Sequence, residues 1–423
     1  MSSVMWAVCG LYSAMCALCF AELGACIPQS GGEYVYIKRA FGDVPAFLCC
    51  WVNLVIVCPV SVAASCLVFA TYILRPVFPD CDPPQEAIRL LAALIILLLI
   101  SLNCINVTWA TKVQVVITGC KLIALGIIII TGFVWIARGH VENFKSSFEG
   151  SDYSASAVAI AFYSGFWAYG GWSYLNFLAD EVVDPHKNLP RAIVISMVIV
   201  TAVYVATNVA YFAVLTPSEM LKSAAVAVTF SQQTVTALQY IMPVLIAASV
   251  IGGINGSCLS MSRLFYVGAK NNHLPCVVSM ITKKQLTPAP SLIVIMILVL
   301  AMQNFEKIFY LIEMMGFSFA VILTTVLAGQ VYLHWKEPKL YRPIKLHVSI
   351  PIVMFLVSCV ILALTVYQKP SESLMTVGLM ALGLPVYAVG VYWSKPAGVN
   401  KVLDSFTVCI QKLLLVVPPD DSQ

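Results

Sequence analysis

The sequence predicts an all-α integral membrane protein, because its composition is strongly apolar and its apolar residues are gathered in long segments. Of the 423 residues, 60% are hydrophobic and only 10% are charged, with a mean hydropathy of +0.91. A soluble domain has about 25% charged residues, so this chain has too few to cover a surface that faces water on all sides. The net charge of +4 is small and spread over short loops, which argues against a nucleic-acid-binding surface.

Eleven segments are apolar enough to cross a bilayer, whose hydrocarbon core takes roughly 20 helical residues. We expect spans near 4–27, 44–74, 88–106, 113–137, 156–179, 191–215, 238–269, 289–303, 308–334, 348–367 and 373–393. Together they form one transmembrane domain over residues 1–393, followed by a C-terminal tail over 394–423. Pro59 and Pro243 lie inside the two longest segments and predict kinks there.

The distribution of Lys and Arg predicts the orientation of these spans. Fifteen of these residues follow odd-numbered spans or lie in the C-terminal tail, whereas six follow even-numbered spans. Because cytoplasmic loops are enriched in Lys and Arg, we expect a cytoplasmic C-terminus, and eleven spans then place the N-terminus outside. Met1 leads into an apolar run without the basic segment of a signal peptide. Two interpretations follow: either a further helix precedes Met1 in the complete protein, or the protein has eleven spans.

The stretch from Gly165 to Trp172 predicts a break in the fifth span. It holds three glycines within seven residues, each of which costs a helix about 1 kcal/mol relative to Ala. Unwound backbone at membrane depth is tolerated where it lines a cavity or is buried in protein, and its free amides and carbonyls can bind the charged groups of a ligand. Trp167 lies beside this break and can act as a lid over such a ligand. The alternative interpretation is close helix packing through small residues.

Two charged residues are expected at membrane depth, Lys121 in the fourth span and Glu313 in the ninth. A cation at that depth is costly and usually faces a polar interior. Lys121 can therefore supply a fixed positive charge where a sodium ion would otherwise sit, or it can form a structural ion pair or reach the interface. Glu22 and Arg263 lie near span ends, and we expect them to reach interfacial water.

Cys81 differs from the other cysteines, most of which lie in apolar runs and behave as small hydrophobic residues. It lies in the polar loop between the second and third spans, which the charge distribution places outside the cell. A single thiol in an oxidising compartment can form an intermolecular disulfide. The alternative is an unpaired, exposed thiol.

No motif indicates an enzyme or an ATP-driven pump. The sequence lacks the nucleophile pattern GxSxG, the zinc pattern HExxH and the phosphate-binding pattern GxxxxGK[ST]. The cysteines and histidines show no zinc-binding spacing either, so we expect no metal and no cofactor. The remaining mechanism for a protein of this class is transport coupled to the gradient of another solute.

Several groups of residues form a pattern that runs along the whole chain. They are Cys19-Phe20-Ala21-Glu22-Leu23-Gly24 with Ser30-Gly31-Gly32-Glu33-Tyr34, Pro79-x-Cys81, Ala168-Tyr169-Gly170-Gly171-Trp172 with Tyr174-Leu175-Asn176, Asn188-Leu189-Pro190, Gly253 to Ser257 with Ser262-Arg263-Leu264-Phe265, and Arg342-Pro343-Ile344-Lys345. With this pattern the chain resembles the light subunits of heteromeric amino acid transporters, in the L-type branch of the amino acid–polyamine–organocation superfamily.

The resemblance implies a LeuT-like fold with inverted repeats, of whose usual 12 spans 11 are present here. It also implies sodium-independent exchange of amino acids and a disulfide-linked partner, a single-span glycoprotein heavy chain. Cys81 matches the position of that disulfide, and Lys121 matches a lysine near the place where sodium-coupled relatives bind their ion.

The resemblance also implies a substrate site around the break. Trp167 matches the aromatic gate, and the backbone of Trp167, Ala168 and Gly170 is expected to accept hydrogen bonds from the substrate ammonium, with Gly171, Ser173 and Tyr174 nearby. The cystine and dibasic exchanger has an acidic residue where this chain has Gly170, which disfavours Lys and Arg as substrates. Glu313 and Ser173 stand where relatives commonly have Asn.

The largest departure from the family concerns the first helix. Relatives begin with a Gly-rich broken helix of the G-S-G-I-F type, whose amides hold the substrate carboxylate, and Met1 stands where their second helix begins. Two functions are therefore weighed. The first is sodium-independent exchange of neutral, large or aromatic L-amino acids across the plasma membrane by alternating access. The alternative is an N-terminally truncated, transport-inactive light chain that only associates with a heavy chain.

Overall fold

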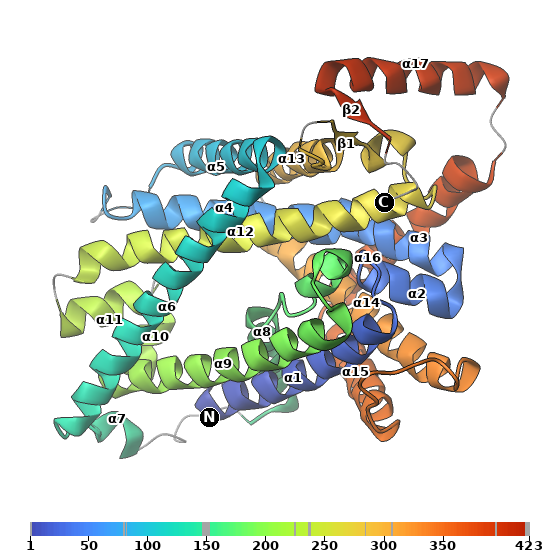
Figure 1. Cartoon of the computed structure of the whole chain (residues 1–423). Helices are drawn as coiled ribbons and strands as arrows, with labels where there is room; N and C mark the ends of the chain where they lie inside the picture. The colour runs from blue at the N-terminus through green and yellow to red at the C-terminus, as the bar shows by residue number, and fades with distance from the viewer. Residues whose placement is uncertain are drawn as a thin grey trace.

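Long apolar helices make up most of the chain in the computed structural model (Figure 1). The structure describes residues 2–78, 81, 83–145, 153–223, 226–235, 238–283, 285–305, 308–393 and 396–418. Pro79 of the Pro79-x-Cys81 motif lies outside the described residues, as do Lys284, Lys307 and Lys395 of the orientation count. Within the described ranges, nine helices have the length and apolar composition to cross a membrane. The predicted all-α membrane class is therefore confirmed.

Within the described ranges the elements are helices, apart from two short strands that form a two-stranded sheet. In chain order they are α1 Ser2–Cys26, α2 Glu33–Phe41, α3 Asp43–Val52, η1 Asn53–Val57, α4 Cys58–Leu74, α5 Gln85–Ile105, α6 Val107–Ala137, α7 Glu142–Lys145, α8 Ala155–Ala168, η2 Tyr174–Glu181, α9 Pro185–Val214, α10 Pro217–Lys222, α11 Val226–Thr234, α12 Leu238–Lys270, η3 Cys276–Ser279, β1 Ile281–Thr282, α13 Ala289–Gln303, α14 Ile308–Lys336, α15 Ser349–Gln368, α16 Pro370–Tyr387, η4 Ala388–Tyr392, α17 Ala397–Leu414 and β2 Val416–Val417. Each of the eleven apolar segments expected from the sequence falls on one to three of these helices. The segment 156–179 falls on two, α8 and η2, which a turn separates.

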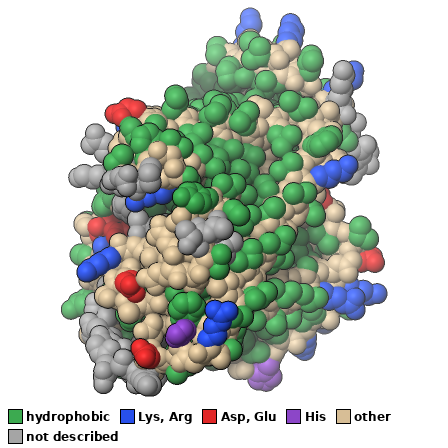
Figure 2. Space-filling model, turned by 90° about the vertical axis from the view of Figure 1, so that its left-hand side faces the viewer, with side chains coloured by type: hydrophobic (Ala, Val, Ile, Leu, Met, Phe, Trp, Pro, Cys, Tyr) green, Lys and Arg blue, Asp and Glu red, His purple; other side chains and the backbone are tan. Residues whose placement is uncertain are grey.

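The helices divide into an inner and an outer group. The span Asp43–Leu74, α1 and α14 have at least half of their most apolar stretch buried, whereas α6 and α16 have about a tenth. Leu122, Ile123 and Phe133 on α6 are exposed, as expected for a face in contact with lipid. Figure 2 shows one face of the molecule, where hydrophobic side chains dominate and charged side chains are scattered.

Proline and a π-helical turn shape the long second span. It runs through α3, η1 and α4, and η1 is a π-helical turn of five residues that ends directly before the first turn of α4, which contains Pro59. Proline lacks an amide proton, and π turns are among the usual causes of helix bending. Pro243 lies inside α12, as expected from the sequence.

The C-terminal tail is ordered into an amphipathic helix, α17, and a short strand. β2 pairs antiparallel with β1, which follows η3, and Ile281 faces Val417 in this pair. In Figure 1 α17 lies at the top right, apart from the helix bundle.

The expectation that Glu22 and Arg263 reach interfacial water is wrong. Glu22 is 1% exposed and its Oε1 lies 3.3 Å from Nε2 of His334 and 3.4 Å from Nε of Arg342. Arg263 pairs through Nε with Oε1 of Glu181 at 2.5 Å, and its side chain is only 13% exposed. A charge near a span end can be satisfied by protein groups as well as by water, and here α14, the loop after it and the end of η2 supply them.

Candidate functional site

The predicted break in the fifth span is present. α8 ends at Ala168, residues 169–173 form turns, and the chain continues as the 3₁₀ helix η2. Gly171 has a φ of +102°, in the left-handed region that favours glycine. Gly165 instead allows close helix packing, because a Cβ there would lie 2.7 Å from Sγ of Cys9 on α1. The glycines therefore divide between packing at Gly165 and the break at Gly170 and Gly171.

The break opens onto a cavity of about 220 Å³. Its lining comes from α2, η1, α4, α8, the turn after α8, η2, α12 and α14: Glu33, Val57, Ser61, Ser65, Phe166, Trp167, Gly170, Gly171, Ser173, Tyr174, Gly253, Ser257, Met261, Met315, Gly316 and Phe319. We call this space the central cavity. Five of the six predicted substrate-binding residues line it. The exception is Ala168, whose carbonyl accepts a hydrogen bond from Oη of Tyr204 at 3.4 Å.

The backbone of the break keeps acceptors for a ligand. The carbonyl of Trp167 accepts the amide of Gly170 at 2.9 Å, and because a carbonyl oxygen has two lone pairs, one remains. Trp167 and Gly170 both line the central cavity. An ammonium group, which only donates, suits such an acceptor.

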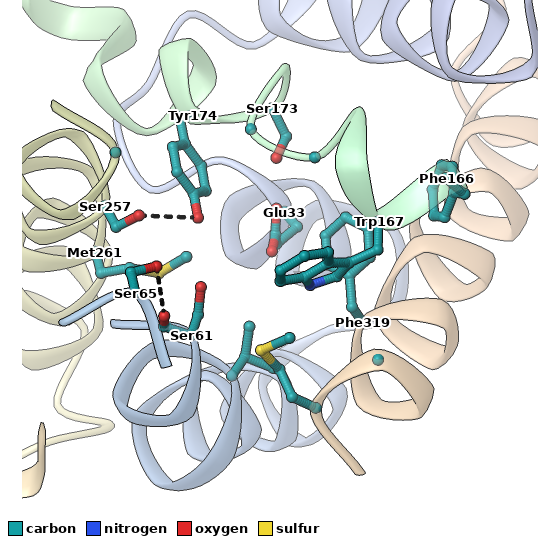
Figure 3. A pocket seen from close by; sticks show the side chains of 16 residues that line it. Glu33, Ser61, Ser65, Phe166, Trp167, Ser173, Tyr174, Ser257, Met261 and Phe319 are labelled. Atoms are coloured by element: carbon teal, nitrogen blue, oxygen red, sulfur yellow. Dashed lines mark hydrogen bonds between the residues drawn. The ribbon is translucent and has the colours of Figure 1, made fainter. Parts of the chain in front are cut away.

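Hydroxyl groups form one side of the central cavity. Figure 3 shows Ser61, Ser65, Ser257 and Tyr174 on the side opposite Trp167 and Phe319. Oγ of Ser257 donates to Oη of Tyr174 at 3.3 Å, so the phenolic proton is available to a ligand. Oγ of Ser65 donates to the carbonyl of Ser61 at 2.9 Å. This wall can donate hydrogen bonds to an anionic group.

Trp167 lies between the central cavity and a larger one. The second cavity, of about 720 Å³, is lined by residues of α1, α8, α14, α15 and α16, and it shares Trp167 and Gly316 with the central cavity. The Trp167 side chain is 54% exposed, so neighbouring atoms leave its ring uncovered. This position is the one that a lid between two compartments requires.

Glu33 is a lining residue that the sequence reasoning did not single out. Its side chain is 2% exposed, and burial raises the pKa of its carboxyl to about 7. Of the lining residues, all within the described part of the chain, Glu33 alone carries an ionisable acid or base of the Asp, Glu, Lys, Arg or His type. The sequence signal that could have identified it is a carboxylate directly after two glycines in Ser30-Gly31-Gly32-Glu33. Gly31 and Gly32 have φ values of +114° and +51°, which favour glycine, directly before α2.

The two membrane-depth charges do not meet each other. Oε1 of Glu313 lies 2.9 Å from Nζ of Lys369 at the start of α16, and both line the second cavity. Lys121 has an exposed side chain on α6 and lines neither cavity. Its role in place of a sodium ion stays a prediction.

Cys81 is exposed and has no disulfide among the described residues. Its carbonyl accepts a hydrogen bond from Nη1 of Arg75 at 3.4 Å, which holds the loop near the end of α4. Among the described residues, no group of three or more His, Cys, Asp or Glu side chains is placed to bind a metal ion.

Comparisons of the sequence with known proteins point to one family. The model of the amino acid permease family matches residues 1–391. The chain is 42% identical over 424 residues to the large neutral amino acids transporter small subunit 2 of Rattus norvegicus, covering 99% of this chain and 79% of that protein. It is 39% identical over 418 residues to the b(0,+)-type amino acid transporter 1 of Mus musculus, covering 99% and 86%. It is 39% identical over 422 residues to the cystine/glutamate transporter of Homo sapiens, covering 100% and 84%.

Proposed function

Because the chain belongs to the amino acid permease family, we propose that it exchanges neutral L-amino acids with large or aromatic side chains across the plasma membrane. The observation that carries this proposal is the break after α8, which opens onto a cavity with polar groups on one side and aromatic rings on the other. Relatives that match nearly the whole chain are named as amino acid transporters.

Each part of an amino acid has a suitable counterpart in the central cavity. The carbonyl of Trp167 accepts a hydrogen bond from the α-ammonium, together with the backbone of Gly170. The hydroxyls of Ser61 and Tyr174 donate to the α-carboxylate, with Ser173 nearby. Phe319 and the ring of Trp167 contact the apolar side chain, since apolar pocket walls with a few placed polar groups are typical of small-molecule sites.

Alternating access follows from the position of Trp167 between the two cavities. With the ring in place, a ligand in the central cavity is separated from the larger cavity. Movement of the ring and of α8 about Gly170 and Gly171 opens the path. We expect exchange without sodium, because Lys121 matches the family lysine near the place where sodium-coupled relatives bind their ion.

We place the C-terminus in the cytoplasm and the loop of Cys81 outside the cell, following the excess of Lys and Arg on one side. Cys81 then forms a disulfide with a single-span glycoprotein heavy chain. Its exposure supports this assignment.

Substitution of the lid tests the proposed function. The chain is co-purified with its heavy chain, reconstituted into liposomes loaded with leucine, and assayed for uptake of labelled phenylalanine. We expect Trp167→Ala to lower the rate about tenfold, equivalent to 1.4 kcal/mol, because the ligand loses its aromatic contact and its lid.

The matched control is Trp335→Ala, since Trp335 at the end of α14 is 71% exposed and lines neither cavity. It should exchange phenylalanine at the wild-type rate. Equal rates of phenylalanine exchange by the two variants would show that Trp167 is not the gate. A wild-type complex that exchanges neither leucine nor phenylalanine would instead support the transport-inactive alternative.

A further inference from the structure

Glu33 is a buried carboxyl group that faces the central cavity. It is the first residue of α2, and its side chain projects between the hydroxyl wall and Trp167 in the view of Figure 3. Burying a carboxylate without a compensating partner is costly. The molecule therefore keeps a costly buried carboxyl group beside the cavity where we propose that the substrate binds.

In the part of the chain that the structure describes, no cation pairs with this carboxylate. None of the ion pairs among the described residues includes Glu33. Its hydrogen bonds come from its own backbone amide and from Asn53. Both leave the negative charge without a counter-ion.

The charged groups on α2 and on the elements packed against it are engaged elsewhere, and Nζ of Lys336 on α14 donates to the carbonyl of Ala40 at 3.5 Å. Arg39 pairs with Glu337 after α14, and Lys38 with Asp43 of α3. His334 of α14 and Arg342 lie against Glu22 of α1. Nδ1 of His273 is hydrogen-bonded to Oη of Tyr34, and burial lowers the pKa of this imidazole. The titratable side chains that act electrostatically with Glu33 itself are Tyr36, Cys49 and Tyr174, which are ordinarily uncharged near pH 7.

We propose that the carboxylate of Glu33 binds an ammonium group of the transported amino acid. This inference rests on the proposed function and adds a charged partner to the carbonyls of the break. An ammonium donates three hydrogen bonds, so one can reach the carbonyl of Trp167 while another reaches Glu33. The ammonium supplies the counter-ion that the described residues do not provide, and the apolar walls strengthen the attraction because little water screens it.

A proton competes with the ammonium for the same carboxylate. The pKa of Glu33 is raised to about 7 by burial, so the carboxyl is mostly neutral at pH 6 and mostly ionised at pH 8. Only the ionised form attracts a cation. Ligand affinity therefore rises with pH, and the change in the ionised fraction between pH 6 and pH 8 corresponds to about tenfold for a pKa near 7.

Equilibrium binding in lipid nanodiscs that hold the full chain with its heavy chain tests this inference. Three probes separate the possible contacts: leucine has an α-ammonium, 2-hydroxy-4-methylpentanoate has the same skeleton without it, and ornithine has a second ammonium on its side chain. We expect leucine to bind about tenfold more tightly at pH 8 than at pH 6, and the hydroxy acid to show no such gain. A gain for ornithine alone would assign Glu33 to a side-chain ammonium.

Two variants assign the effect to this residue. Glu33→Gln should bind leucine with one affinity at both pH values, about tenfold weaker than wild type at pH 8, because it keeps the shape and loses the charge. Glu337→Gln removes a carboxylate outside the central cavity and should retain the pH dependence. His334 is intact in both variants, so a pH dependence lost only in Glu33→Gln does not come from His334. The wild-type series needs no variant and stands even if Glu33→Gln fails to fold.

The outcomes are distinct from those of the proposed function. A wild-type protein that binds and exchanges leucine, with affinities for leucine and ornithine that are independent of pH, would overturn the role of Glu33 alone. A wild-type protein that binds no leucine at either pH would overturn the proposed function and this inference together.

Discussion

Glu22 shows how a charge near a span end becomes part of the core. Its Oε2 accepts a hydrogen bond from Nε2 of Gln330 at 2.9 Å, while Oε1 faces His334 and Arg342. All of these groups are nearly buried, and Arg342 is 7% exposed. A buried ion pair adds little net stability, but removing one partner leaves the other charge uncompensated. The cluster joins α1 to α14 and to the loop that follows it.

The substitution Glu22→Gln should therefore destabilise the protein strongly. It keeps the size of the side chain and leaves Arg342 as a buried cation, for which a loss of about 3–5 kcal/mol is typical. The control is Glu337→Gln, which breaks the exposed pair with Arg39 and should cost about 0–1 kcal/mol. The apparent melting temperatures of the two purified variants measure these losses of stability. Equal decreases in melting temperature would show that the buried cluster stabilises the protein no more than a surface ion pair does.

At this scale the sequence predicts what is local and misses what distant elements bring together. Gly170, Gly171 and Trp167 lie within one turn, so their composition alone predicted the break and its aromatic neighbour. Glu33 and Ser61 reach the same cavity from α2 and α4, more than 100 residues away in the sequence. Ala168 is adjacent to Trp167 but its carbonyl points to Tyr204, a direction that sequence position does not reveal.

Between elements, close contact depends on small residues at particular crossings. α6 packs against α9, and a Cβ built on Gly132 of α6 would overlap Ala210 of α9. Gly126, less than two turns earlier on α6, has no heavy atom within 4 Å of the same position. The two glycines look alike in sequence, and only the helix crossing separates them.

Alanine substitutions at these positions should act in opposite directions. Gly132→Ala forces α6 and α9 apart, and overpacking of this kind costs about 1–3 kcal/mol. Gly126→Ala meets no neighbour and gains helix propensity, so its stability should equal or exceed that of the wild type. Thermal unfolding in detergent gives the comparison, and a destabilised Gly126→Ala with an unaffected Gly132→Ala would contradict this packing.

For the whole molecule, composition and segment length predicted the class and the helix positions, because a bilayer requires long apolar helices. They did not predict that α17 is ordered, because the length requirement applies to spans and an 18-residue amphipathic helix in the tail need not meet it. They also did not predict the pairing of Glu313 with Lys369, which depends on how α14 and α16 approach each other. Composition and segment length likewise do not determine which way the bundle faces in the membrane or which heavy chain binds it, because these depend on the complete assembly.

The partner assignment leads to a prediction about the complete assembly. Cys81 is exposed in the loop after α4, and the charge distribution places this loop outside, where thiols are oxidised. Cys81→Ser should therefore abolish the covalent complex with the heavy chain, seen as loss of the high-mass band on non-reducing gels of cell membranes.

The control is Cys276→Ser, which removes another exposed cysteine on the side that we place in the cytoplasm, and it should keep the band. A band that survives Cys81→Ser and disappears with Cys276→Ser would invert the orientation. Phenylalanine exchange by Cys81→Ser should fall only as far as its surface amount falls, because the disulfide lies away from both cavities. Labelling of surface protein alongside the exchange assay separates these quantities, and a loss of exchange per molecule would show that the covalent link acts on the transport cycle itself.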